Sequence, residues 1–306
     1  IIAGAPALNF TGVAASFLNV VQHMFPDPQD LGAALVTPAE RQLLRNAIEA
    51  KCDAADGLRD SMLQDPSACD FDPTSLLCRD TQTSQCLSAD KLAAVRAVYD
   101  GPRDGQGPLH FGFPFGAEDV EDNGWGSWLT GGAEQGSPNA AYNFGVGIMR
   151  NFVYHAADWG YADYDWDTFR TDVAPVAAVL DANNTDLDAF RQQGGKLLMY
   201  HGWADVALTG YMSTDYIERV YMRDKTARDD VRLFMMPGVL HCYDGIGPSV
   251  VDWLAEVAKW HDTGQAPDTL NASYPDKPGQ RKLCAWPRKP RFIGGDPERP
   301  ESYRCR

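Results

Sequence analysis

The stretch "GKLLMYHGWAD", residues 195–205, is an apolar run that ends abruptly in a polar turn. A second stretch of the same kind, "VRLFMMPG" at residues 231–238, runs directly into "VLHC" at residues 239–242. Helical patterns follow both stretches, "TDYIERVYMRDK" at residues 214–225 and "SVVDWLAEVAKWHD" at residues 249–262. Strand, helix, strand and helix at this spacing are typical of the βα repeat of a parallel sheet, so we predict an α/β fold.

The first residues of the chain fit the same layer. The run "IIAGAPA" at residues 1–7 reads as a strand, and "GVAASFLNVVQHMF" at residues 12–25 has helical spacing. We therefore predict that residues 1–36 and 192–306 together form a doubly wound α/β core. Residues 37–191 separate these pieces and differ from them in composition, so we expect an inserted lid domain there.

Two capped helices stand out within the insertion. Thr37 as the N-cap, Pro38 at the first helical position and Glu40 three residues after the cap predict a helix over residues 37–50. A second capped helix starts near Ser88. The remaining segments are Cys-, Asp- and Pro-rich residues 51–81, Gly- and aromatic-rich residues 101–140, and residues 143–193, where helices alternate with aromatic turns.

Composition excludes several classes of partner. The 306 residues carry a net charge of −15, which argues against nucleic acid and against an anionic membrane surface. No uncharged apolar run reaches the length of a membrane span, so we expect no membrane segment. The chain opens inside an apolar run without Met or a signal-peptide pattern, and we expect an N-terminal portion of the protein to be missing.

The cysteine pattern predicts local disulfides. None of the seven cysteines forms C-x₂-C, and no histidine stands at zinc spacing. Three local pairs suggest themselves in loops that lack a core of their own, Cys52–Cys69, Cys78–Cys86 and Cys284–Cys305. Disulfides of this kind predict a secreted or periplasmic protein, and Asn9, Asn183 and Asn271 are glycosylation sequons that matter only in a eukaryotic host. Cys242 is left without a partner.

Two polar residues follow the predicted strands at the edge where parallel sheets carry their functional groups. Asp205 follows "KLLMY" and His241 follows "VRLFMM". Their order is that of an α/β-hydrolase, whose triad runs Ser, Asp or Glu, then His. The aspartate would orient one imidazole nitrogen while the other takes a proton from a serine hydroxyl. The alternative is that Asp205 caps a helix and His241 is an ordinary turn residue.

A nucleophilic serine of this fold stands in G-x-S-x-G or a close variant, on a sharp turn from strand to helix. No serine before Asp205 meets that description, and Ser127 in "GWGSWLTGG" comes nearest without a buried strand before it. Either the protein is not a hydrolase of this kind, or the nucleophile lies upstream of Ile1. The other serines considered were Ser16, Ser61, Ser67, Ser75, Ser84, Ser88 and Ser137.

Four motifs in order, "IIAGAPA", "CDAADGLRD", "GKLLMYHGWAD" and "MPGVLHC", resemble the tannase and feruloyl esterase family, which includes mono(hydroxyethyl)terephthalate hydrolases. The likeness covers nearly the whole chain. It implies an α/β-hydrolase fold with N-terminal strands missing from this chain, and a triad acid and base at Asp205 and His241. The family's nucleophile lies in a C-S-x-G-G elbow that matches no residue here, nor do its oxyanion-hole amides. The resemblance also implies a disulfide from Cys242 to the cysteine of that elbow.

The same resemblance implies a structural Ca²⁺ ion in the lid. The family's calcium loop matches "CDAADGLRDSM", with carboxylates from Asp53, Asp56 and Asp60 and backbone carbonyls from Leu58 and Met62. Three carboxylates within eight residues, with a glycine for the bend, form a plausible site of hard oxygen ligands, although the pattern is not an EF-hand. A solvated Asp-rich loop is the alternative.

Aromatic residues of the insertion are candidates for contact with an aromatic substrate, namely Trp125, Trp128 and Phe144, although rings in such a region more often pack in its core. We expect His201 to hold the strand end near Asp205. Arg150 could meet a carboxylate, but we favour an exposed or lid-packing role.

These observations predict a serine-type carboxylic ester hydrolase that acts on small esters of aromatic acids such as ferulic or gallic acid, with terephthalate monoesters as a variant. The chain alone, without the N-terminal segment that carries the serine, is expected to be inactive. A secreted calcium- or carbohydrate-binding module without catalysis is the rival from another class, and a peptidase of the same fold is a second rival.

Overall fold

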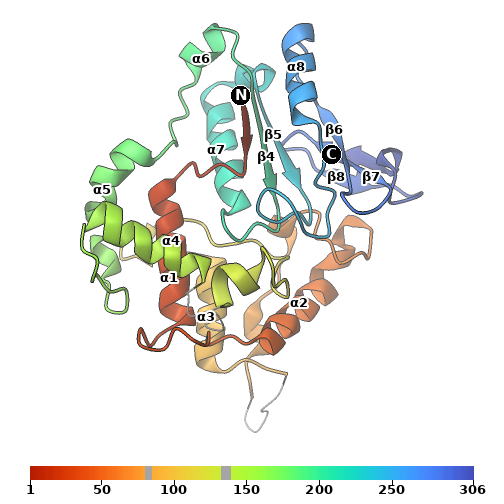
Figure 1. Ribbon diagram of the computed structural model, residues 1–306. Helices are drawn as coiled ribbons and strands as arrows, with labels where there is room; N and C mark the ends of the chain where they lie inside the picture. Colours follow the sequence, from red (N-terminus) through yellow and green to blue (C-terminus); the bar gives the residue numbers. More distant parts are fainter. Residues whose placement is uncertain (80–84, 132–138) are drawn as a thin grey trace. The chain divides into compact units, whose positions relative to one another are not determined.

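The computed structural model describes residues 1–79, 85–131 and 139–306, and its contacts divide the chain into two compact units. The sheet unit comprises residues 1–6, 51–69 and 183–306, and the helical unit comprises residues 7–50 and 70–182 (Figure 1).

This division differs from the predicted one in two places. Residues 7–36 were expected with the sheet but belong to the helical unit, because helix α1 (Phe10–Met24) packs against α3 (Ala89–Asp100) and α4 (Ala140–Ile148). Residues 51–69 were expected in the lid but belong to the sheet unit, where they contact the C-terminal strands.

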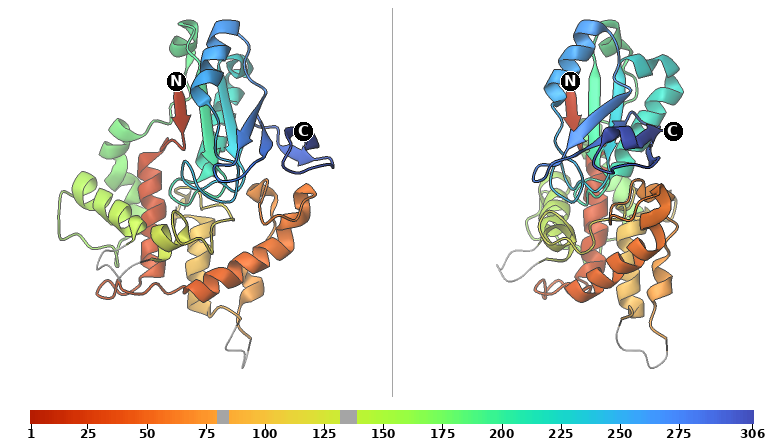
Figure 2. Two further views of the ribbon diagram at one scale, coloured as in Figure 1. Left: turned by 45° about the vertical axis from the view of Figure 1, so that its right-hand side comes forward. Right: turned by 90° about the vertical axis from the view of Figure 1, so that its right-hand side faces the viewer.

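Three parallel strands form the sheet in the order β1 (Ile2–Gly4), β4 (Leu197–Gly202) and β5 (Val231–Met236). Leu198 pairs with Ile2 on one side and with Arg232 on the other. Every residue of β5 is buried, as expected for a parallel strand covered on both faces. Helices α7 (Gly210–Arg223) and α8 (Trp253–Thr263) cover opposite faces of these strands (Figure 2). The predicted parallel βα repeat is confirmed.

The core of the sheet unit lies between the strands, α8 and an antiparallel hairpin. Leu198, Phe234, Trp260, Leu270 and Leu283 are all at least 96% buried and belong to one cluster. The hairpin consists of β6 (Thr269–Ser273) and β7 (Gln280–Cys284), and a second ribbon of β8 (Pro290–Phe292) and β9 (Tyr303–Cys305) follows it. The disulfide Cys284–Cys305 joins β7 to β9. A short helix α6 (Asp188–Gln192) precedes β4.

The helical unit is built around α1, whose residues from Thr11 to Val21 are all buried. Helix α4 approaches α1 closely because Gly145 has no side chain: a Cβ there would stand 2.8 Å from the backbone nitrogen of Leu18. The other elements are α2 (Pro38–Cys52), α3, α5 (Phe169–Leu180) and the short strands β2 (Arg103–Asp104) and β3 (Gly107–Pro108).

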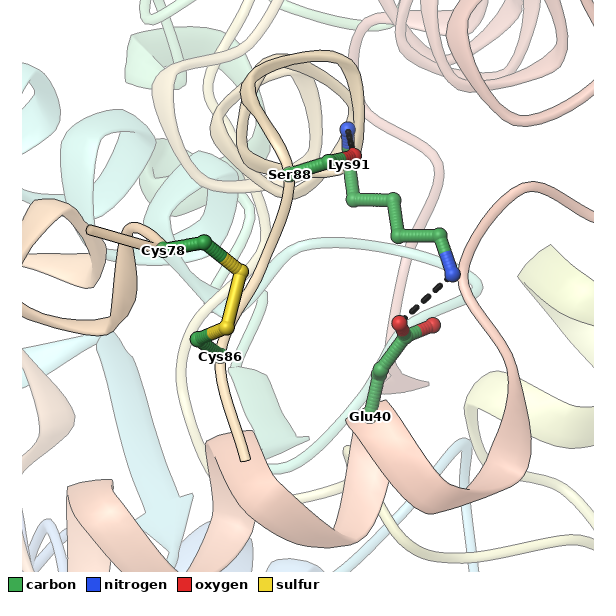
Figure 3. Close-up of a disulfide and its surroundings, with 5 residues drawn as sticks. All are labelled: Glu40, Cys78, Cys86, Ser88 and Lys91. Carbon is green, nitrogen blue, oxygen red and sulfur yellow. Dashed lines mark hydrogen bonds and ion pairs between the residues drawn. A yellow bond between two sulfur atoms is a disulfide. The ribbon is translucent and has the colours of Figure 1, made fainter. Parts of the chain in front are cut away.

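The predicted caps and local disulfides are confirmed. The Glu40 carboxylate accepts the Thr37 N–H at 2.9 Å, and the Ser88 hydroxyl accepts the Lys91 N–H at 3.4 Å. Lys91 also donates to Glu40 at 2.5 Å, beside the disulfide Cys78–Cys86 (Figure 3). The disulfide Cys52–Cys69 closes the segment that contains residues 53–62, called the acidic loop below, and Cys242 is a free cysteine.

Within the described residues, none of the helices combines the length and the apolar character that a bilayer crossing requires. Of the serines considered above, Ser84 and Ser137 lie outside the described residues.

Candidate active site

The structure brings Asp205 and His241 together at the ends of β4 and β5. The Nδ1 atom of His241 lies 2.9 Å from Oδ2 of Asp205. The aspartate side chain is fully buried, whereas the histidine side chain keeps 27% of its surface exposed. A buried acid that orients a partly exposed imidazole is the arrangement that general base catalysis needs.

Four donors surround the Asp205 carboxylate. Oδ1 accepts the backbone N–H groups of Ala207 and Leu208, both at 2.8 Å. Oδ2 lies near His241 Nδ1 and near His201 Nε2, the latter at 3.2 Å. Burial acts to raise the pKa of Asp205, but hydrogen bonds from His201 and His241 outweigh it and lower the pKa to about 2. The carboxylate therefore stays charged at neutral pH. Asp205 does not cap α7, whose N-cap is Thr209.

His201, which was expected to hold the strand end near Asp205, lies in β4 beside this carboxylate. Its ring is completely buried, with Nε2 2.7 Å from the Leu208 carbonyl oxygen and Nδ1 2.7 Å from the Ser213 hydroxyl. Because a carbonyl oxygen only accepts, Nε2 carries a hydrogen that it donates to Leu208.

Gly202 allows the loop that carries Asp205 and the turn that carries His241 to approach each other. A Cβ at this position would lie 2.2 Å from the Val239 carbonyl oxygen and 2.4 Å from that of Leu240. The backbone N–H of Ala204 donates to Val239 at 3.0 Å, and that of Trp203 donates to Met236 at 2.9 Å. The glycine of "HGWAD" is therefore a geometric requirement of the Asp205–His241 pair.

The turn of residues 237–247 carries His241 on a strained backbone. Cys242 and Asp244 adopt φ values of +64° and +62°, in the left-handed region that residues other than glycine seldom occupy. The Leu240 N–H donates to Asp244 at 3.2 Å and closes the turn. Burial acts to lower the pKa of His241, but the hydrogen bond and the charge of Asp205 outweigh it and raise the pKa.

Cys242 does not act as the nucleophile of this pair. Its Sγ lies 4.0 Å from both ring nitrogens of His241, so it stands beside the ring and not in line with one nitrogen. Burial and the charge of Asp205 raise the pKa of its thiol, which disfavours the reactive thiolate.

The acidic loop is ordered by its own backbone. The Asp53 carboxylate accepts the Asp60 N–H at 3.2 Å, and the Asp56 carboxylate accepts the Leu58 N–H at 2.9 Å. Burial, together with the charges of Asp60 and Asp53, raises the pKa of Asp56 to about 6. The donor chemistry fits a hard divalent cation.

The loop differs from a preformed metal centre in one respect. Across the described residues, no three acidic, histidine or cysteine side chains are grouped as metal ligands. One carboxylate is already engaged, because Arg281 donates to Asp60 at 2.5 Å. Arg281 is a site residue that sequence reasoning missed, since an arginine more than 200 positions away carries no local signal.

The three predicted substrate-contacting aromatics have different environments in the helical unit. Trp125 is completely buried, and its ring centre lies 5.6 Å from that of Tyr99, so it belongs to the core of the unit and has no surface left for a substrate. Trp128 and Phe144 stack at 5.9 Å with an angle of 15° between their planes, and both stack on Phe17. Phe144 is 51% exposed and is available to a further ring.

Arg150 packs within the helical unit, which is one of the two roles favoured from the sequence. Its Nε donates to the carbonyl oxygen of Trp159 at 2.7 Å, and its guanidinium lies 6.0 Å from the centre of the Tyr142 ring.

Comparison with known proteins places these observations in a family. The family model described as tannase and feruloyl esterase matches residues 1–306. An uncharacterized esterase of Xanthomonas campestris pv. campestris is 31% identical over 100% of this chain and 60% of its own length. Mono(2-hydroxyethyl) terephthalate hydrolase of Piscinibacter sakaiensis is 30% identical over 100% of this chain and 59% of its own length. The chain therefore spans about three fifths of these curated relatives.

The fold is shared with solved structures. Feruloyl esterase B from Aspergillus oryzae superposes with a TM-score of 0.86 at 24% identity, covering 100% of this chain and 63% of the other. Tannin acyl hydrolase from Aspergillus niger gives a TM-score of 0.75 at 23% identity, with 100% and 59% covered. The predicted α/β-hydrolase-like fold is confirmed.

Proposed function

Because the chain belongs to the tannase and feruloyl esterase family, we propose that it forms the acid and base part of a serine-type carboxylic ester hydrolase. His241 removes the proton of an attacking serine hydroxyl and later returns it to the leaving alcohol, and Asp205 orients the imidazole and stabilises its charged form. The single observation that carries this proposal is the 2.9 Å contact between a partly exposed His241 and a buried, ionised Asp205.

The nucleophile of the proposed triad is a serine upstream of Ile1. The serines of this chain lack the flanking glycines of a nucleophile elbow, and β1 is the edge strand of the parallel sheet, with β4 as its partner among the described strands. A further parallel strand beside β1 would bring a strand-to-helix turn to the same edge as Asp205 and His241. A disulfide from Cys242 to that turn would fix the distance between two catalytic loops.

The proposed substrates are esters of aromatic acids. Relatives named feruloyl esterase and mono(2-hydroxyethyl) terephthalate hydrolase support this class. Within the chain, the stacked rings of Trp128 and Phe144 form an aromatic surface on which an aromatic acyl group would stack. Disulfides in the chain, and relatives among fungal feruloyl esterases, support an extracellular location.

We also propose that the acidic loop binds a structural Ca²⁺ ion. Asp53, Asp56 and Asp60 would hold it with their carboxylates, and Leu58 and Met62 with their carbonyl oxygens. A cation there would stabilise the charged form of Asp56, whose pKa is raised by burial and by the charges of Asp60 and Asp53.

The substrate proposal is tested by a panel of esters offered to the full-length protein that contains this chain. We expect faster hydrolysis of methyl ferulate, methyl gallate and mono(2-hydroxyethyl) terephthalate than of an aliphatic ester with the same alcohol. Equal rates on aromatic and aliphatic acids would refute the assignment of substrate class, and hydrolysis of none of them would refute the assignment of activity.

A further inference from the structure

The acidic loop reaches the turn of His241 through one side chain. Met62 is 97% buried, and a Cβ built at Gly238 would stand 2.9 Å from its Cγ. Met62 therefore packs directly against the Gly238 backbone, three residues before the catalytic histidine. Gly238 adopts a φ of +65°, which a residue with a side chain seldom accepts. The turn depends on both the glycine and the methionine beneath it.

Arg281, on strand β7, holds the segment that contains Met62. One guanidinium nitrogen donates to Oδ2 of Asp60 at 2.5 Å, and the other lies 3.4 Å from the sulfur of Met62. The Met62 N–H donates to Oδ1 of Asp60 at 3.2 Å, which closes the arrangement. Arg281 is 96% buried, and its guanidinium lies 5.5 Å from the centre of the Tyr303 ring on β9.

These contacts form a continuous path from Arg281 through Asp60 and Met62 to Gly238, and from there along the turn to His241. We propose that Arg281 is a positioning residue of the catalytic site, which fixes the His241 turn by pressing Met62 against Gly238. The proposal rests on the proposed function, because it takes His241 as the catalytic base. The proposal also links the acidic loop to the site, because a cation bound by Asp60 would affect the same contacts from Asp60 through Met62 to Gly238.

The pKa of His241 should respond differently to loss of Arg281 if the arginine forms only a structural ion pair than if it positions the turn. Removing the positive charge of Arg281 acts electrostatically to raise the pKa of a histidine, because one repelling charge is lost. Loosening the turn instead weakens the contact between His241 and Asp205 and lowers the pKa of His241. The direction of the change therefore separates the two roles.

The test is an NMR titration of the His241 imidazole in the 306-residue chain, assigned among the six histidines with a His241→Ala variant. Arg281→Met and Met62→Ala should both lower the pKa of His241 toward the ordinary histidine value, and Arg281→Lys should restore part of the shift. Met62→Ala changes no charge, so it tests the packing step alone.

Arg232→Met is the matched control. Arg232 is also at least 90% buried and pairs with an aspartate, Asp268 at 3.3 Å, but it lies at the opposite end of β5 from the turn. It should lower the thermal midpoint without moving the titration of His241. In the full-length enzyme, Arg281→Met should lower kcat roughly 10- to 100-fold with little change in KM.

An unchanged or raised His241 pKa in folded Arg281→Met and Met62→Ala variants would overturn the positioning role. The positioning role would also be overturned if the His241 pKa fell by the same amount in the Arg232→Met control. These results are distinct from a failure of the proposed function, which would appear as an absence of ester hydrolysis in the unaltered full-length protein.

Discussion

The backbone of Gly202 lies so close to Val239 that a single added carbon on the glycine would stand 2.2 Å from the Val239 carbonyl oxygen. Strand β4 ends at this glycine, and Val239 begins the segment that leads to His241. The contact between Asp205 and His241 depends on this close approach of the two backbones.

Replacing Gly202 by alanine should therefore damage both stability and activity. The methyl group forces the loop of Asp205 away from the turn of His241. Overpacking of this kind costs about 1–3 kcal/mol, and more where, as here, the obstacle is backbone. Thermal unfolding measures the loss. Gly147→Ala in α4 is the matched control, because a Cβ there meets nothing within 4 Å, and alanine should stabilise the helix by up to about 1 kcal/mol. Equal midpoints for the two variants would contradict this reading of Gly202.

Asp205 should make the folded state sensitive to acid. Its pKa falls from the ordinary 3.8 to about 2 on folding, so its stabilising contribution is present above about pH 4 and is lost as pH falls through 2. The shift corresponds to roughly 2 kcal/mol. Urea unfolding between pH 2 and pH 7 should show this slope in the unaltered chain and a shallower one in Asp205→Asn. Identical slopes would show that the carboxylate is not stabilised as the structure implies.

The contribution of His241 to folding stability depends on pH in the opposite direction. Because its pKa is raised on folding, its contribution is complete below the ordinary histidine pKa and is lost as pH rises through the folded value.

Calcium should stabilise the acidic loop and with it the sheet unit. Adding Ca²⁺ after EGTA treatment should raise the thermal midpoint, and Asp56→Asn should reduce that increase because it removes one of the three charges. Asp30→Asn, on an exposed loop of the helical unit, is the control and should leave the calcium response intact. A midpoint in the unaltered chain that is the same in Ca²⁺ and in EGTA would rule out the site.

Alanine substitutions of Phe144 and Trp125 should have different effects, one on substrate binding and the other on stability. Phe144→Ala removes a half-exposed ring, so in the full-length protein we expect a higher KM for an aromatic ester and little loss of stability. Trp125→Ala removes a fully buried ring and should cost about 3–5 kcal/mol. Steady-state kinetics and thermal unfolding measure the two effects. An unchanged KM in Phe144→Ala would remove this ring from the set of substrate contacts.

The sequence predicted those features that depend on local patterns. The strands around Leu198 and Phe234 were visible as apolar runs, the helix caps as short motifs, and the three disulfides as neighbouring cysteines in poorly packed loops. The strand-end positions of Asp205 and His241 followed from the rule that functional groups gather at one edge of a parallel sheet.

The features that sequence reasoning missed depend on contacts between distant residues. The acidic loop was placed with the lid because it interrupts the chain there, whereas Arg281 and Gly238 hold it in the sheet unit. Helix α1 was placed with the sheet because a strand precedes it, whereas Gly145 lets α4 bind it in the helical unit. The β6–β7 hairpin had a local signal, the turn residues "YPDKPG" between two alternating runs, which was not used.

The most direct test of the central claim is the hydrolysis of a feruloyl ester by the full-length protein, with and without His241→Ala. The same ester, as its nitrophenyl analogue, is offered to the 306-residue chain alone. We predict that His241→Ala lowers kcat/KM by about 10⁴-fold or more, and that the isolated chain gives no burst of nitrophenol. Full activity in His241→Ala would contradict the assignment of the base. A stoichiometric burst from the isolated chain, abolished by His241→Ala, would contradict the placement of the nucleophile upstream of Ile1.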